Sequence, residues 1–412
     1  MTTSTEQMRA WTGPAILTYG FRPFFFGAGV WAAMAMVLWV PMLSGDLTLP
    51  AAFDPVSWHA HEFLFGYLGA VIAGFLLTAV PNWTGRLPIV GWPLGGLFAL
   101  WLMGRAAVAV SLYLPPLGVA LADLALPLAL AAVIGREIVA GKNWRNLIVL
   151  AMLGVLILGN AVFHWEAARG DYAAGGYGLR IGLGAVIMMI AVIGGRIVPS
   201  FTRNWLAKRA PGRLPVPPMQ RFDKAALLVL LLGLLAWVAL PDHAMTAILL
   251  LLAGGLHAIL LLLAGGLHLV RLARWAGDRT LAEPLVAVLH LGYFFLPLGA
   301  VAIAAEILMP GPLGMASAQH LWMGGAAGLM TLAVMTRATL GHTGQALTAG
   351  PGTVGIYAAL VGAVLARLAA GIWPDQAHLL HMAAGSGWIF AFGGFTLFYG
   401  PLLLRLPAAK RI

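Results

Sequence analysis

Runs of about 20 apolar residues recur from one end of this chain to the other, separated by short segments with Pro, Gly or charged residues. A helix of about 20 residues spans the hydrocarbon core of a bilayer, which is roughly 30 Å thick. The pattern therefore predicts an all-α polytopic membrane protein, with a single transmembrane domain over residues 1–412. We expect twelve transmembrane helices, near residues 23–43, 59–81, 91–111, 116–136, 145–166, 176–199, 222–241, 245–271, 283–306, 317–340, 352–372 and 377–404.

Positive charge is concentrated in every second connection between these helices. Most of the 24 Lys and Arg residues fall in or beside loops and tails on the same side of the bilayer as the N-terminus. Because cytoplasmic loops are enriched in Lys and Arg, we expect both termini in the cytoplasm. The first residues lack the pattern of a removable signal peptide, so the first helix should be retained. The net charge of +10 then fits basic loops facing anionic lipid head groups and predicts no nucleic-acid partner.

Composition limits the chemistry that the chain can perform. It is 61% hydrophobic and only 9% charged, and it contains no Cys. Disulfides, thiolate metal sites and Cys nucleophiles are excluded, so imidazole, thioether and carboxylate are the strong ligands that remain. Covalent haem attachment through Cys-x2-Cys-His is excluded for the same reason, and no electron-donor site can be recognised.

A short motif recurs near the inner ends of three helices. The second helix carries Val80-Pro81-Asn82-Trp83-Thr84, the sixth carries Val198-Pro199-Ser200-Phe201-Thr202, and the tenth carries the looser Val334-Met335-Thr336-Arg337. Helices four apart would fit a pseudo-three-fold arrangement of four-helix units. The alternative is that Pro and polar residues simply mark the end of each helix.

Several of the 11 histidines fall at similar depths. An outer tier contains His59 and His61 at the start of the second helix, His164 at the end of the fifth and His320 one turn into the tenth; His378 and His381 could join it. A polar ring inside hydrocarbon is costly unless it pairs, faces water or binds a metal. Imidazole is a common ligand for copper, iron and haem, although an interfacial ring bonded to water is the alternative for any single boundary histidine.

A second, inner tier is predicted from the eighth and ninth helices. At a rise of about 1.5 Å per residue, His257 lies roughly 18 Å below the outer end and His290 roughly 11 Å above the inner end. These depths would make the two rings level on antiparallel neighbours, so they could form a second site if both face the interior.

Two arginines, Arg105 and Arg367, fall within the third and eleventh helices, where an unpaired charge is expensive. Each should have a partner or a water-filled cavity. Asp123, on the fourth helix, is a suitable partner for Arg105.

Several long and unusual motifs resemble the NnrS family, and the resemblance covers essentially the whole chain. It rests on Gly20-Phe21-Arg22-Pro23-Phe24-Phe25, Trp58-His59-Ala60-His61-Glu62, the stretch from Gly74 to Arg86, the stretch from Gly194 to Asn204, Leu289-His290-Leu291-Gly292-Tyr293, and the stretch from Met335 to Gly344. The resemblance implies a bacterial inner-membrane protein with twelve helices that contains haem and copper. It further implies a role in nitric oxide metabolism, as in denitrification, and in resistance to nitrosative stress.

The helix count and the outer histidines are also similar, at the level of fold, to the catalytic subunit of haem-copper oxidases and nitric oxide reductases. This chain has no adjacent His-His pair and no His-x-His on the tenth helix. An oxidase-type binuclear centre therefore cannot be carried over residue by residue.

Our hypothesis is a haem- and copper-binding core. His61 and His320 are the expected ligands of a non-covalent b-type haem, His59 and His164 those of copper, and His257 with His290 a second candidate site. Glu62 and Glu166 would orient imidazoles or pass protons, unless they are ordinary interfacial acids. Arg196 and Arg337 would hold haem propionates or an anionic ligand only at an inner site, and otherwise anchor helices in head groups.

Two classes of function fit these residues. The first is a metalloprotein that binds nitric oxide or a related small redox ligand, with or without turnover. The second is a transporter that moves a metal complex or a nitrosylated species by means of the same histidines. A haem band that shifts on adding nitric oxide would favour the first, and a colourless protein the second.

Overall fold

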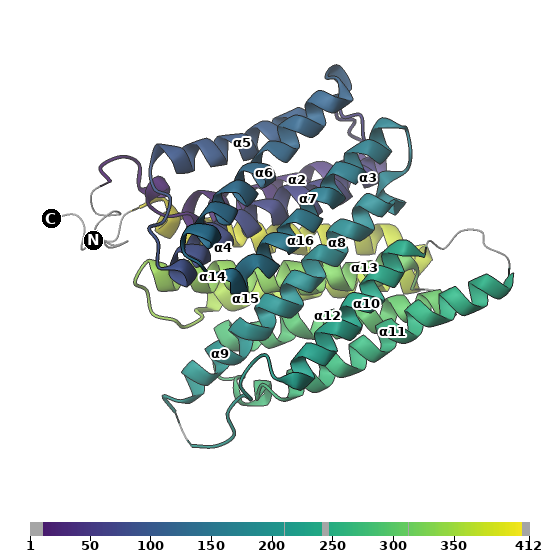
Figure 1. The fold of residues 1–412 in the computed structure, drawn as a ribbon. Helices are drawn as coiled ribbons and strands as arrows, with labels where there is room; N and C mark the ends of the chain where they lie inside the picture. The colour runs from purple at the N-terminus through teal and green to yellow at the C-terminus, as the bar shows by residue number, and fades with distance from the viewer. Residues whose placement is uncertain (1–10, 210, 241–246, 312, 406–412) are drawn as a thin grey trace. The chain divides into compact units, whose positions relative to one another are not determined.

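The computed structural model describes residues 11–209, 211–240, 247–311 and 313–405, and within these ranges the chain forms helices, turns and loops without any strand. Among the described residues, eleven helices are long and apolar enough to cross a membrane. The predicted helix near 317–340 is present as Met315–His342, but it is not among the eleven, because Gln319, His320 and Arg337 lower its hydropathy. The twelve predicted helices are thus confirmed, and the chain is a multi-pass membrane protein (Figure 1).

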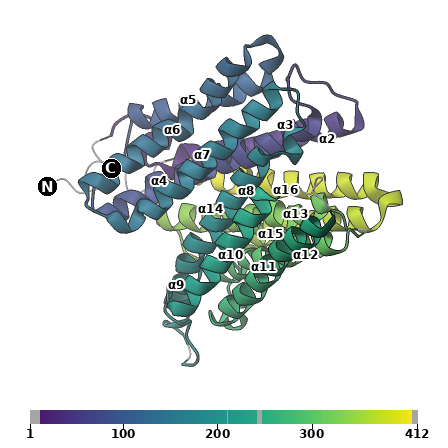
Figure 2. The same ribbon diagram turned by 45° about the vertical axis from the view of Figure 1, so that its right-hand side comes forward.

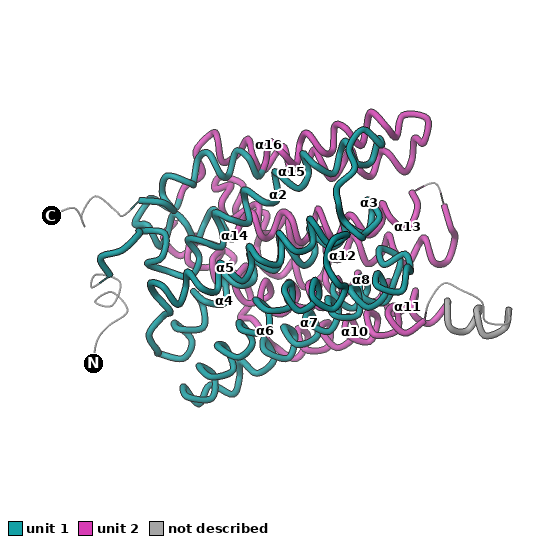
Figure 3. The backbone as a smooth tube through the Cα atoms, turned by 90° about the horizontal axis from the view of Figure 1, so that it is seen from above, with its two compact units in different colours: residues 1–182, 335–347, 392–412 teal, residues 183–334, 348–391 magenta. Residues whose placement is uncertain are grey.

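The chain divides into two compact units (Figure 3). Unit 1 holds the described residues within 1–182, 335–347 and 392–412, and unit 2 those within 183–334 and 348–391. The single transmembrane domain expected from the sequence stays a prediction.

Unit 1 is built on five membrane-spanning helices, one of which changes its winding. In α3 the chain enters the membrane, continues through the π-helical segment η2 and leaves as α4. Helices α5, α6 and α7 follow and lie side by side in Figures 1 and 2. The bounds are α2 Phe21–Ser44, α3 Pro55–His61, η2 Glu62–Tyr67, α4 Leu68–Thr84, α5 Trp92–Ala109, α6 Pro116–Ala140 and α7 Leu147–Ala168.

Unit 2 contains most of the remaining helices. Within it α11 packs against α10 and against α12. Helices α8, α14 and α16 each extend across the boundary between the two sets of residues. The bounds are α8 Tyr177–Met189, η6 Ile190–Gly194, α9 Gly195–Leu206, α10 Arg221–Ala239, α11 Ala247–Ala273, α12 Pro284–Leu308, α13 Met315–His320, η8 Leu321–Gly328, α14 Leu329–His342, α15 Pro351–Ile372 and α16 Ala377–Leu404.

Short 3₁₀ turns make up the remaining helical segments. They are η1 Ala15–Thr18, η3 Ser111–Tyr113, η4 Trp144–Asn146, η5 Ala173–Gly175, η7 Gly277–Arg279 and η9 Pro374–Gln376. Most lie just before a spanning helix, where the chain tightens as it turns back toward the bilayer.

In the part of the chain that the structure describes, three spanning helices contain a π-helical segment, and they are the second, sixth and tenth in chain order. The segments are η2, η6 and η8. These are the helices in which the short sequence motif recurs. π-helical turns are rare and frequently lie at functional sites, because the extra residue redirects the side chains around it. The pseudo-three-fold repeat itself stays a prediction.

Local sequence fixes where the helices of unit 1 begin and end. The Asp54 carboxylate accepts hydrogen bonds from the backbone N–H groups of Val56 and Ser57 at 3.0 and 2.9 Å, and Pro55 occupies the first turn of α3. Both features favour a helix start. At the other end of the same membrane crossing, Gly85 stops α4 in a left-handed conformation with φ 69°.

Arg22 ties the beginning of α2 to the end of α16 within unit 1. Its Nη1 donates to the backbone oxygens of Leu402, Leu403 and Arg405 at 3.2, 2.9 and 3.0 Å. The last carbonyls of a helix have no partner within the helix, so a buried guanidinium satisfies them. This contact gives the arginine of the Gly20–Phe25 motif a structural role.

Candidate metal centre

Three side chains of unit 1 converge on one point inside the protein. They are His61 from α3, Asp123 from α6 and His164 from α7, all buried, and one potential ligand atom from each lies within 4.8 Å of the others. Asp123 Oδ2 is 3.1 Å from His61 Nε2 and 3.0 Å from His164 Nε2. Within the described part of the chain, no other group of His, Asp or Glu is arranged in this way.

The three residues meet because they lie at similar depths. His61 is about 9 Å along its helix from Pro55, and Asp123 is about 10 Å from Pro116, at 1.5 Å per residue. His164 is about 6 Å before the last residue of α7. Helices α3 and α6 begin on the same side of unit 1 as the side on which α7 ends. The trio therefore lies at a depth of roughly 6–10 Å from these helix ends.

A second layer of polar groups surrounds the trio. Arg105, on α5, donates to Glu62 Oε1 and to Asp123 Oδ1, which confirms the predicted pairing with Asp123. Glu62 Oε1 also lies 3.0 Å from His61 Nδ1. Both ring nitrogens of His61 therefore face carboxylate oxygens. A metal ion bound at Nε2 would replace the proton there, while Nδ1–H would still donate to Glu62.

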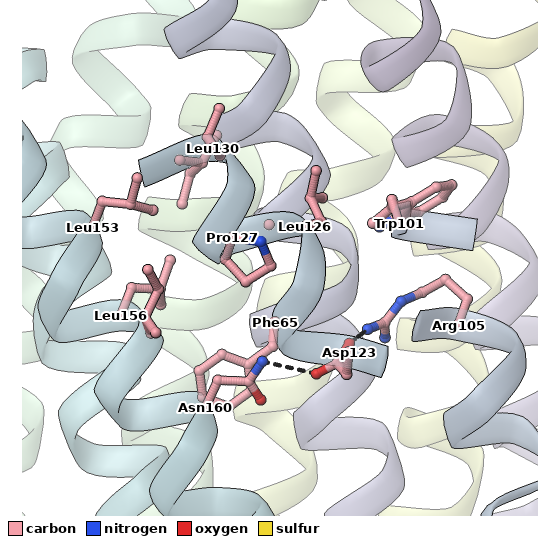
Figure 4. A pocket seen from close by; sticks show the side chains of 13 residues that line it. Phe65, Trp101, Arg105, Asp123, Leu126, Pro127, Leu130, Leu153, Leu156 and Asn160 are labelled. Carbon is pink, nitrogen blue, oxygen red and sulfur yellow. Dashed lines mark hydrogen bonds and ion pairs between the residues drawn. The ribbon is translucent and has the colours of Figure 1, made fainter. Parts of the chain in front are cut away.

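Asn160 completes this layer from α7, one turn before His164. Its Nδ2 donates to Asp123 Oδ2 at 2.8 Å, and its Oδ1 lies 3.1 Å from His61 Nε2. Figure 4 shows Asn160 and Arg105 approaching Asp123 from opposite sides. Asn160 was not among the site residues predicted from the sequence. It could have been recognised as a polar amide inside an apolar helix, on the same helix face as a histidine four residues later.

Aromatic rings enclose the two histidines. Phe53, Phe65 and Phe163 have ring centroids 5.3, 5.4 and 5.4 Å from that of His61, and the His61 and His164 rings are 4.9 Å apart. This packing excludes water and strengthens electrostatic interactions within the group. Since both ring nitrogens of His61 already face polar side chains at 3.0–3.1 Å, no room is left beside them for a macrocycle, so the residues here fit a single metal ion and do not fit a haem.

A pocket adjoins the trio between α4, α5, α6 and α7. Arg105, Asp123 and Asn160 form its polar part, and the remainder is mainly apolar, including Trp101 and Leu126 (Figure 4). Trp101 is held in place because its Nε1 donates at 3.0 Å to the backbone oxygen of Gly66, in the π-helical segment. A small uncharged ligand could approach Asp123 along this pocket.

His59, the outer histidine two residues before His61, is not part of the trio. His59 stacks on Trp39, with ring centroids 4.0 Å apart, and lies 4.6 Å from the ring of Phe63. His59 and His61 are two residues apart on α3, so their side chains point in different directions. Only His61 points toward His164 and Asp123. His320 belongs to unit 2, where its Nδ1 donates to the backbone oxygen of Ala316 at 2.6 Å.

Glu166 has a role that the sequence did not predict. Its Oε1 accepts from the backbone N–H of Tyr177 at 2.6 Å, and its Oε2 accepts from that of Gly178 at 3.1 Å. The carboxylate therefore satisfies the first N–H groups of α8 and interacts favourably with the helix dipole. Gly178 also allows close packing of α8 on α7, because a Cβ there would collide with the backbone of Phe163.

The predicted depth match between His257 and His290 is wrong. Counting from the loop that joins α11 to α12, His257 lies about 24 Å from Ala273, and His290 lies about 9 Å from Pro284. Helix α11 is longer than the 30 Å core that the prediction assumed, which displaces His257 outward. His290 instead lies 2.8 Å from Thr202 Oγ1 through its Nε2.

A buried polar cluster in unit 2 involves a different histidine, His268. Tyr293 Oη lies 2.7 Å from His268 Nδ1 and accepts from Arg271 Nη1 at 2.8 Å. Arg271 Nε also donates to Asp223 Oδ1 at 2.8 Å. This arginine is thus paired within the membrane, as Arg105 is.

The two inner-side arginines of the prediction are half-buried. Arg196 lies in α9, in unit 2. Arg337 lies in α14, whose last residue, His342, packs 5.3 Å from the rings of Tyr19 and Phe21 at the beginning of α2. Because the trio lies toward the other end of α2, Arg337 is remote from it.

Fold and site together define a polytopic membrane protein with a buried His–Asp–His group suited to a metal ion. The profile of the family described as NnrS protein matches residues 15–406 of the 412-residue chain. The chain belongs to the NnrS family. No curated protein matches it.

Proposed function

We propose that this protein holds copper at His61, Asp123 and His164 and binds nitric oxide or a related small redox ligand there, in nitric oxide metabolism and resistance to nitrosative stress. The observation that carries the proposal is the convergence of two buried imidazoles and a carboxylate within 4.8 Å. Membership of the NnrS family supports the physiological part, through what the resemblance implies.

The donor set supports a transition metal. Two imidazoles and one carboxylate suit copper, iron or zinc, and binding to nitrogen and oxygen ligands generally strengthens toward copper along the first-row divalent series. Glu62 and Asn160 would hold the His61 ring and the Asp123 carboxylate in orientation, as partners of metal ligands commonly do. The adjoining pocket would admit a diatomic ligand to the bound ion.

The proposal also includes a non-covalent b-type haem. The packing around His61 leaves no room for haem at that residue, whereas the hydrogen bond made by His320 favours His320 as a haem ligand. Donation from His320 Nδ1 to a backbone oxygen leaves Nε2 as the ring nitrogen with the lone pair, which is the tautomer of many metal-ligating histidines. Because His257 and His290 lie at different depths, they are not proposed to share a second site.

Location in a bacterial inner membrane with cytoplasmic termini also belongs to the proposal. It is supported by the distribution of Lys and Arg among the loops. This topology would put the trio near the outer face, so copper and the small ligand would reach it from outside.

Metal analysis of purified variants tests the proposal. His61→Gln and His164→Gln should lose most of the bound copper measured by mass spectrometry, because each removes a ligand. His59→Gln is the matched control, since His59 lies two residues away and stacks on Trp39. Equal copper in all four proteins would refute the metal assignment. Copper present without any spectral change on adding nitric oxide would refute the ligand.

A further inference from the structure

Arg367 is an intramembrane arginine that has no carboxylate partner among the described residues. It lies on α15, five residues before the end of the helix at Ile372, and is half-buried. Its Nη1 donates to Ser317 Oγ, on α13, at 2.9 Å. No Asp or Glu pairs with it within the part of the chain that the structure describes. A guanidinium inside a membrane helix is costly without a counter-charge, so a neutral hydroxyl does not account for its position.

The neighbours of Arg367 in unit 2 include imidazole rings. His320, on α13, and His381, on α16, both lie close enough to Arg367 to interact with it electrostatically, and His378 lies close enough to His381. All of these residues belong to unit 2. The group presents a guanidinium, a hydroxyl and imidazole rings, which together offer N–H and O–H donors to an anion.

The same helix positions in unit 1 carry the opposite balance of charge. In each unit a histidine directly precedes a π-helical segment, His61 before η2 and His320 before η8. The next spanning helix carries an arginine close to its end, Arg105 or Arg367.

The third position of the pattern differs between the units. Counting from the helix with the π-helical segment, the third spanning helix begins at Pro116 in one case and at Pro374 in the other. Asp123 lies seven residues after Pro116, and His381 lies seven residues after Pro374. One unit therefore supplies a carboxylate to its arginine, and the other supplies an imidazole.

We propose that Arg367, Ser317 and His381 form a binding site for a phosphate-type oxyanion, separate from the metal centre. A planar guanidinium fork matches the geometry of an oxyanion, and a hydroxyl and an imidazole N–H can complete its coordination. The oxyanion would supply the negative charge that Asp123 supplies in unit 1.

The local packing supports a preformed and accessible site. A Cβ on Gly371 would collide with Ser317 Oγ and with the backbone oxygen of Leu313, so α13 and α15 are held in close contact beside Arg367. His381 is half-buried and His378 is exposed, which leaves a route for a ligand. The position close to helix ends is where both lipid phosphates and aqueous anions are present.

Calorimetry on the full chain in neutral detergent tests the proposal with inorganic phosphate as the probe. Arg367→Gln removes the guanidinium, and His381→Asp recreates the arrangement of unit 1 by giving Arg367 an internal carboxylate. Both should weaken phosphate binding by at least about tenfold, because each removes or neutralises a charge-assisted contact. Arg169→Gln is the matched control, since it removes one exposed arginine and leaves the site unchanged.

A second arm distinguishes the source of the oxyanion. Protein released from nanodiscs of phosphatidylglycerol or phosphatidylcholine is weighed by native mass spectrometry. Retention of phosphatidylglycerol by the native protein, lost in both site variants, would identify a lipid head group; binding of free phosphate with the same dependence would identify a soluble anion. The proposal fails if neither probe binds, or if Arg169→Gln reduces binding equally. It also fails if the site variants lose only haem, which would assign Arg367 to a haem propionate.

Discussion

Arg105 and Arg367 occupy similar positions in two different units, yet their surroundings differ. Arg105 bonds to two buried carboxylates beside two histidines. Arg367 bonds to a serine hydroxyl beside two histidines. Two acidic residues, Glu62 and Asp123, take the positions that Leu321 and His381 hold in unit 2. They decide whether a similar helical framework presents carboxylates to a cation or a positive group to an anion.

Removing each arginine in turn should give the largest contrast. Arg105→Met leaves Glu62 and Asp123 buried without their cation, so it should lower the free energy of unfolding by about 3–5 kcal/mol. Arg367→Met removes a charge that has no carboxylate partner in the described ranges and should cost less than about 1 kcal/mol in phosphate-free buffer. Thermal unfolding in detergent measures both. Equal losses would mean that the two arginines contribute alike and that the contrast is wrong.

Replacing the carboxylate of unit 1 by an amide should separate metal binding from folding. Asp123→Asn keeps the shape of the side chain but removes the charge that pairs with Arg105, for a loss of about 2–3 kcal/mol. Copper affinity should fall by more than about 100-fold, beyond the usual effect of an indirect contact. Copper titration followed by optical spectroscopy measures this change. Wild-type affinity in this variant would exclude Asp123 as a ligand.

Asn160 should have a smaller effect, since it touches the ligands without having to bind the ion. Asn160→Leu removes two hydrogen bonds and should cost about 1–3 kcal/mol of stability. Copper affinity should decrease by roughly 10–100-fold. The same titration applies, with His59→Gln as the control that should keep native affinity. A complete loss of copper would instead make the Asn160 oxygen a ligand.

Glu166 should show the smallest effect and no change in metal content. Glu166→Gln reduces the interaction with the beginning of α8, which should lower stability by about 0.5–1 kcal/mol. Copper content should stay at the native level, because both carboxylate oxygens face backbone N–H groups of α8. Loss of copper would restore the role in orienting an imidazole that the sequence suggested.

The helices were the most predictable part of the molecule. The first was predicted near 23–43 and spans Phe21–Ser44. The agreement is close because a continuous run of about 20 apolar residues has the length that a helix needs to cross the hydrocarbon core. The second begins at Pro55 and not near 59, since Asp54 and Pro55 start the helix before the apolar run does. The π-helical segments were not predicted, because they depend on packing between helices.

The site was predictable only in part. Depth along the helices placed His61 and His164 in one tier, and the cost of an unpaired charge led from Arg105 to Asp123. The same counting failed for His257 and His290, because helix α11 extends beyond the length that the bilayer requires. His59 and His61 could not be ranked from the sequence, since that requires the rotation of α3 about its axis.

By itself, the sequence determined that the chain crosses the membrane many times, that histidines and a few charges lie at particular depths, and that its motifs resemble the NnrS family. Tertiary structure decided which of those residues meet. Helices that are apolar on nearly every side carry little information about which face turns inward, because lipid and protein interior are similarly apolar. The packing of α3, α6 and α7 chose His61 over His59, recruited Asn160, and left Arg367 with a hydroxyl where Arg105 has two carboxylates.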